Sequence, residues 1–202
     1  MTMKNRPFFF VSLFFTLLVC AQAQEHTTIR RSSRSMVAGA IPGDNVLRFY
    51  RMAVPVTYSA FEQDFDMDYN KVVSFWREVE TYMNHIYVPL GFCFDIIEDK
   101  ALVMTAGNMI DKNIYNAPSF GTELLNEVIS PSAYDIGIWV THRDDFEENS
   151  GLSIEYGAYM PSTKASGYAK TDKWVVAHEV GHLLGANHTS GGEGSLMDNG
   201  GD

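Results

Sequence analysis

Cysteine is nearly absent from this sequence of 202 residues, which contains only Cys20 and Cys93. The chain therefore lacks both the cysteine pairs of a closed structural zinc site and a disulfide framework. Cys93 lies in the apolar stretch GFCFDII, which predicts a buried strand and an inert thiol.

Positive charge is also scarce. The chain has 15 Lys and Arg residues against 25 Asp and Glu residues, which gives a formal net charge of −10. Proteins that bind nucleic acid through its phosphates need a basic surface, so we expect no nucleic-acid partner.

Long apolar runs are confined to the N-terminus. There, Lys4 and Arg6 precede an apolar stretch over residues 8–19, which is followed by the small-residue sequence AQA at 21–23. This order predicts a secretory signal peptide over residues 1–23, and hence a secreted protein. Its removal leaves 13 Lys and Arg residues and a still more acidic chain.

The same apolar run is too short to cross a membrane. It has about 12 residues, whereas a membrane-spanning helix needs about 20. An alternative is a lipid-anchored N-terminus at Cys20, although Val19 is bulky for the position before such a cysteine. Residues 24–45 are polar and then rich in Gly and Pro, which predicts a linker or a short pro-segment.

Residues 46–202 are predicted to form one domain in which strands and helices alternate. The expected strands cover 46–59, 92–98 and 134–142, and the expected helices cover 68–87, 122–130 and 171–184. Apolar side chains at steps of three and four residues indicate the helix over 68–87. This order of elements predicts an α/β domain with parallel neighbouring strands.

The stretch HEVGHLLGANH, residues 178–188, contains three of the six histidines. On a helix, His178 and His182 project from one face about 6 Å apart, so both can reach one metal ion. Gly185 suits the end of the helix, after which His188 can return as a third ligand. The alternative for these histidines is a solvated polar stripe on a helix.

Three imidazoles and one water make an open tetrahedral zinc site, as in catalytic rather than structural zinc centres. Cobalt, nickel and copper would also bind three nitrogens. Zinc lowers the pKa of its bound water, and Glu179 is placed beside that water as a general base and acid.

HEVGHLLGANH followed by the methionine of SLMD resembles the metzincins, whose pattern is H-E-x-x-H-x-x-G-x-x-H with a downstream methionine turn. The resemblance implies zinc-dependent hydrolysis of peptide bonds in a protein or peptide substrate. The residues that it assigns are His178, His182 and His188 as ligands of one zinc ion, Glu179 as the catalytic residue, Gly185 as the turn and Met197 as the apolar floor beneath the metal.

The stretches YDIGIWVTH and WVVAHEVGHLLGANHT, with a Gly-rich segment between them, look like the reprolysin (adamalysin-like) branch found in secreted bacterial proteins. This branch implies an α/β (α+β) metzincin-like fold. It has a twisted, mostly parallel sheet with an antiparallel edge strand, a backing helix and an active-site helix.

In this family the substrate lies extended along the edge strand. We expect that strand within SIEYGAYM, residues 153–160, where Tyr156, Gly157 and Ala158 would contact the substrate; the alternative is a surface hairpin.

Metzincins normally continue past the methionine turn with a specificity loop and a C-terminal helix, whereas this sequence stops at Asp202. We therefore expect that the C-terminal subdomain is truncated, either because the sequence is cut short or because this member lacks that part. Two functions follow from these features. The first is a secreted zinc endopeptidase that uses Glu179. The second is a non-catalytic zinc-binding protein that binds a partner through its edge strand.

Overall fold

The computed structural model describes residues 46–106, 120–142, 150–189 and 195–198. The predicted signal peptide (1–23), Cys20 and the predicted linker (24–45) lie outside these residues. In the described part of the chain, none of the helices combines the length and the apolar composition of a membrane span.

One half of the sheet is built around strand β1, Arg48–Ala53. It pairs in parallel with β2, Phe92–Ile96, on one side and with β3, Ile136–Gly137, on the other. The predicted first strand ends earlier than residue 59, because Pro55 follows it and Thr57 caps the next helix.

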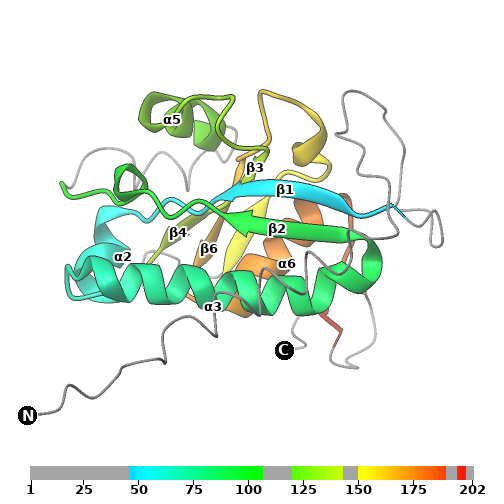
Figure 1. Ribbon diagram of the computed structural model, residues 1–202, viewed down its shortest axis with the longest axis horizontal. Helices are drawn as coiled ribbons and strands as arrows, with labels where there is room; N and C mark the ends of the chain where they lie inside the picture. The colour runs from blue at the N-terminus through cyan, green and yellow to red at the C-terminus, as the bar shows by residue number, and fades with distance from the viewer. Residues whose placement is uncertain (1–45, 107–119, 143–149, 190–194, 199–202) are drawn as a thin grey trace, which may run out of the picture.

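The other half of the sheet is built around β6, Gly167–Lys170. It pairs in parallel with β4, Trp139–Thr141, and in antiparallel fashion with β5, Gly151–Ser153. The Val140 N–H donates to Pro55 O at 2.8 Å, and Val140 O accepts from the Thr57 N–H at 2.9 Å. The strands thus form two three-stranded sheets, in the orders β2-β1-β3 and β4-β6-β5, and these bonds around Val140 link the two sheets (Figure 1). The prediction of a mostly parallel sheet with an antiparallel edge is confirmed.

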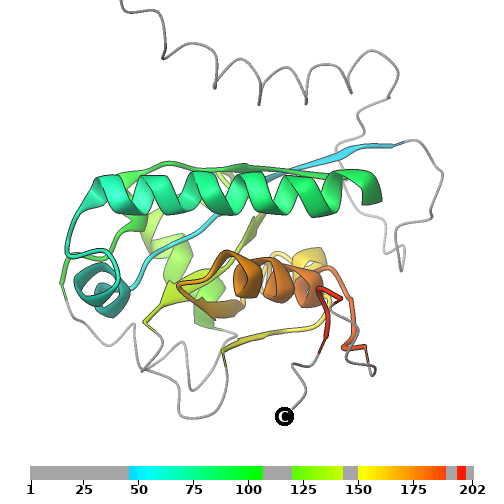
Figure 2. The ribbon, with the colours of Figure 1, turned by 90° about the horizontal axis from the view of Figure 1, so that it is seen from below.

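Two helices lie on one face of the sheet, as Figures 1 and 2 show. Helix α3 spans Tyr69–Tyr87, which confirms the predicted helix over 68–87, and Asp68 caps it by accepting from the Asn70 N–H at 2.9 Å. Helix α6 spans Lys173–Leu183 and packs against α3. A hydrogen bond of 2.7 Å from the Tyr87 hydroxyl to Ala177 O joins the two helices.

Shorter elements complete the domain. Helix α5, Phe120–Val128, lies on the opposite face of the sheet (Figure 1), where Gly121 O accepts from the indole N–H of Trp139 at 2.9 Å. The remaining elements are α2, Tyr58–Gln63, and the 3-10 turns Val88–Leu90, Lys100–Leu102 and Gly157–Tyr159. Cys93 is buried on β2, as predicted.

The predicted edge strand over residues 153–160 is wrong. The edge strand β5 ends at Ser153, and Gly157–Tyr159 form a 3-10 turn. Tyr156 has a φ of 60°, and its N–H donates to His182 O at 3.1 Å instead of to a neighbouring strand. These backbone bonds to α6 and within the turn replace the strand pairing that the sequence pattern suggested.

Trp76 anchors α3 to the sheet, because its fully buried indole donates to Val54 O at 2.9 Å. We expect Trp76→Phe to keep most of the packing and to lose this bond. The free energy of unfolding should then fall by about 2 kcal/mol, since Val54 O loses its indole donor in the core. Urea unfolding followed by circular dichroism measures this change, and an unchanged midpoint would contradict this role.

Candidate metal and catalytic site

Three histidine side chains converge at the end of α6. His178 and His182 lie on successive turns of the helix, and their Nε2 atoms are 3.1 Å apart. His188, which follows the helix, places its Nε2 3.1 Å from that of His178 and 3.0 Å from that of His182. Among the described residues, these three form the cluster that could hold a metal ion.

Backbone carbonyls fix the orientation of the first two rings. His178 Nδ1 lies 2.7 Å from Leu196 O, and His182 Nδ1 lies 2.8 Å from Ala186 O. A carbonyl only accepts, so each Nδ1 carries the hydrogen and each Nε2 presents a lone pair. Burial lowers the pKa of His178 and His182, although these carbonyl bonds act in the opposite direction. The neutral imidazole that binds metals is therefore favoured.

The arrangement fits a zinc ion. Nitrogens bound to one tetrahedral zinc at the usual distance lie about 3.3 Å apart, close to the spacing seen here. Without a cation, the lone pairs of His178 and His182 would face each other at 3.1 Å, which is repulsive. Three neutral imidazole nitrogens are also the donor set of open zinc sites.

The turn after α6 brings His188 back to the helix. Gly185 has a φ of 93°, in the left-handed region that favours glycine, and its N–H donates to His182 O at 2.8 Å. The ring of Tyr156 covers Gly185 so closely that a Cβ there would lie 2.3 Å from Cε1 of the ring. Both the positive φ and the lack of space beside the Tyr156 ring therefore require glycine at position 185.

Met197 lies beside the histidine helix. Its O accepts from the Thr189 N–H at 2.8 Å, and its sulfur packs against α6, where a Cβ on Gly181 would meet it at 2.5 Å. The neighbouring Leu196 supplies the carbonyl that orients His178. Residues 195–198 thus pack on α6 and orient His178. The role of Met197 as the apolar floor beneath a metal stays a prediction.

Glu179 is buried between α6 and the edge strand, with a relative exposure of 4%. Burial raises the pKa of its carboxyl group to about 7, and the nearby Ser153 hydroxyl acts in the opposite direction. A group with this pKa exchanges protons readily near neutral pH, as a general base and acid must.

Several contacts of the site were not predicted from the sequence. The ring of Trp174 stacks on that of His178, with centroids 5.2 Å apart and an angle of 30° between the ring planes. Its position one helical turn before His178 could have indicated this contact. The backbone carbonyls that orient His178 and His182 could not be predicted from the sequence, because every residue type has one.

The predicted substrate contacts are not on the edge strand. Instead, Tyr156, Gly157 and Ala158 lie at or in the 3-10 turn that follows β5. The ring of Tyr156 packs on Gly185, and Gly157 packs near Leu183 at the end of α6. These residues support the turn between α6 and His188, whereas β5 lies against Glu179.

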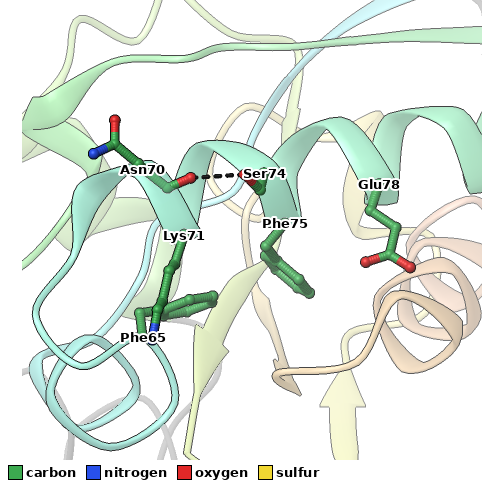
Figure 3. Close-up of a pocket in the computed structure, with 6 residues that line it drawn as sticks. All are labelled: Phe65, Asn70, Lys71, Ser74, Phe75 and Glu78. Atoms are coloured by element: carbon green, nitrogen blue, oxygen red, sulfur yellow. Dashed lines mark hydrogen bonds between the residues drawn. The ribbon is translucent and has the colours of Figure 1, made fainter.

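A separate hollow of about 380 Å³ lies along α3 (Figure 3). It is lined by Phe65, Asn70, Lys71, Ser74, Phe75 and Glu78. Its ionic groups are paired, Lys71 with Asp66 and Glu78 with Lys173. None of the three histidines lines it, and among the described residues no group of possible metal ligands is found there.

Comparison with known proteins places these features in a family. No curated protein matches the sequence at a significant level. A solved structure described as "Structure of a chaperone-substrate complex" matches 75% of this chain with a TM-score of 0.54 and 12% identity. The match covers 28% of that longer chain, and at 12% identity the likeness concerns the fold alone.

The family comparison is more specific. The profile of the family described as "Metallo-peptidase family M12B Reprolysin-like" matches residues 71–189, which include most of α3, the edge strand β5 and all three histidines. This match supports zinc-dependent peptidase chemistry in general. The chain belongs to the reprolysin-like metallopeptidases of family M12B.

Proposed function

We propose that this protein is a secreted zinc endopeptidase in which Glu179 transfers protons during peptide hydrolysis. One observation carries the proposal: the helix that supplies two of three imidazoles, whose nitrogens lie 3.0 to 3.1 Å apart, also carries a buried carboxylate, Glu179, directly after His178. A site that served metal binding alone would not need this carboxylate. Its burial costs free energy, which a catalytic role would explain.

Zinc, when bound, supplies a Lewis acid that polarises a peptide carbonyl and makes water more acidic. Glu179 accepts a proton from the attacking water and returns it to the nitrogen of the leaving amine. The raised pKa of Glu179, about 7, favours both transfers near neutral pH. His178 and His182 stay neutral and fixed, because carbonyl groups hold their Nδ1 hydrogens.

The substrate is proposed to lie extended along β5. This strand pairs with β6 on one side, and among the described residues no strand pairs with its other side. The free edge offers backbone N–H and C=O groups to a peptide strand, in the manner of strand addition. Gly151, on the same strand, lies against the Glu179 carboxylate. A peptide bound at this edge would therefore pass close to the catalytic group.

Export is part of the same proposal. It is supported by the two N-terminal cations, the apolar run over residues 8–19 and the AQA sequence at 21–23. The deficit of Lys and Arg against Asp and Glu is compatible with a protein substrate and not with nucleic acid.

Cleavage of an unfolded protein such as casein tests the proposal. We expect the purified zinc-loaded protein to cleave casein and a chelator to abolish the cleavage. Added zinc should restore it, because the histidines supply the ligands. A protein that binds one zinc ion but cleaves neither casein nor a peptide library would instead support the non-catalytic alternative.

A further inference from the structure

The edge strand turns two small residues toward the catalytic helix. Gly151 and Ser153 are two positions apart on β5 and share one face of the strand. Between them, Leu152 is 44% exposed, as expected for the opposite face. A Cβ on Gly151 would lie 2.5 Å from Oε1 of Glu179, so the strand backbone lies directly against the carboxylate.

Two buried polar atoms at this contact make no hydrogen bond within the described residues. They are the hydroxyl oxygen of Ser153 and Oε2 of Glu179. Leaving such an atom unsatisfied costs about 1–3 kcal/mol, so native proteins rarely keep one without a function. Gly151 lies against the Glu179 carboxylate, and Ser153 is on the same face of β5 two residues later, so the strand turns this hydroxyl toward the helix that carries Glu179.

The Ser153 hydroxyl has little room to move elsewhere. A Cβ on Gly167 of the adjacent strand β6 would lie only 2.2 Å from the Ser153 oxygen. The hydroxyl is therefore confined between β6 and α6.

We propose that Ser153 is a positioning residue for Glu179: its hydroxyl donates a hydrogen bond to Oε2 when substrate occupies the edge strand. This bond holds the carboxylate in one orientation and leaves Oε1 free to exchange protons. The inference rests on the proposed peptidase function. It assigns β5 a second role, because the strand that would bind the substrate would also orient the catalytic group.

Ser153→Ala is the test, measured as kcat and KM for a peptide substrate. We expect kcat to fall about tenfold or more, the effect of losing a hydrogen bond to a charged group. KM and zinc content should stay unchanged, because the Ser153 side chain is not one of the possible metal ligands and the substitution keeps the backbone that would pair with the substrate. In urea unfolding of the zinc-free protein the midpoint should not fall, since the lost hydroxyl had no partner.

Ser74→Ala is the matched control. The Ser74 hydroxyl is exposed on α3 and donates to Asn70 O at 2.8 Å, far along the chain from the site (Figure 3). It should leave kcat unchanged. Ser153→Ala made in a Glu179→Gln background should add no further loss, because the hydroxyl acts through the carboxylate.

A kcat of Ser153→Ala within twofold of the wild-type value would overturn the inference. A loss of kcat that comes with a loss of zinc or a lower unfolding midpoint would also overturn it, in favour of a structural role. If the wild-type protein itself cleaves nothing, the proposed function fails first, and the role of Ser153 fails with it.

Discussion

Replacing Glu179 by glutamine is expected to lower kcat/KM about 1,000-fold while leaving zinc binding intact. General acid–base catalysis contributes about 10²–10⁴-fold, and glutamine keeps the shape of the side chain without accepting the proton. The side chain does not contribute to the cluster of metal-binding nitrogens. Zinc content measured by atomic emission, together with peptide cleavage rates, separates the two effects.

Stability distinguishes this result from simple misfolding. Glu179 is a buried carboxylate with one unpaired oxygen, so removal of its charge should leave the thermal midpoint unchanged or higher. Glu62→Gln on the exposed surface of α2 is a matched control and should retain full activity. Cleavage at the wild-type rate by Glu179→Gln would refute the assigned role of Glu179.

Replacing Gly185 by alanine should damage both the fold and the metal site. A φ of 93° is strained for alanine, and the new Cβ would lie 2.3 Å from the ring of Tyr156. Strain of this kind costs about 1–3 kcal/mol before the clash is added. Relief of the clash displaces the turn that carries His188, so we expect zinc affinity to fall more than tenfold. Zinc titration monitored by calorimetry measures that loss.

Gly91→Ala is the control that separates a general loss of stability from damage to the metal site. Gly91 also has a positive φ, 87°, and a Cβ there would lie 3.0 Å from Val46 O, but it lies between α3 and β2. This variant should be destabilised in urea and should bind zinc with unchanged affinity. Equal zinc affinities for the two variants would show that Gly185 does not position His188.

The main helix and the parallel strands were predictable because their signals are local. The buried side chains of α3, including Trp76 and Met83, recur at helical spacing, and Asp68 stands where a cap is needed. The turn at Tyr156 was not predictable in this way. Its positive φ accompanies a hydrogen bond to His182 O and packing on Gly185, both distant in sequence. Strand-like composition therefore gave the wrong structure for this segment.

The same distinction holds in the site. The spacing of His178 and His182 on one helix determines their proximity, so the sequence alone could assign them. The partners that orient them are backbone carbonyls of Leu196 and Ala186, which any residue type could supply. Ser153 comes near Glu179 only through the pairing of β5 with β6 and the packing of α6 on the sheet. A contact of this kind depends on the whole fold.

Zinc titration of the chelated, dialysed protein tests the central claim most directly, with bound zinc and casein cleavage followed in the same samples. If the three histidines bind one ion and Glu179 of the same helix transfers the proton, both quantities rise together and stop at one equivalent of zinc. Cleavage that persists without zinc, or one tightly bound equivalent with no cleavage at all, would contradict the account.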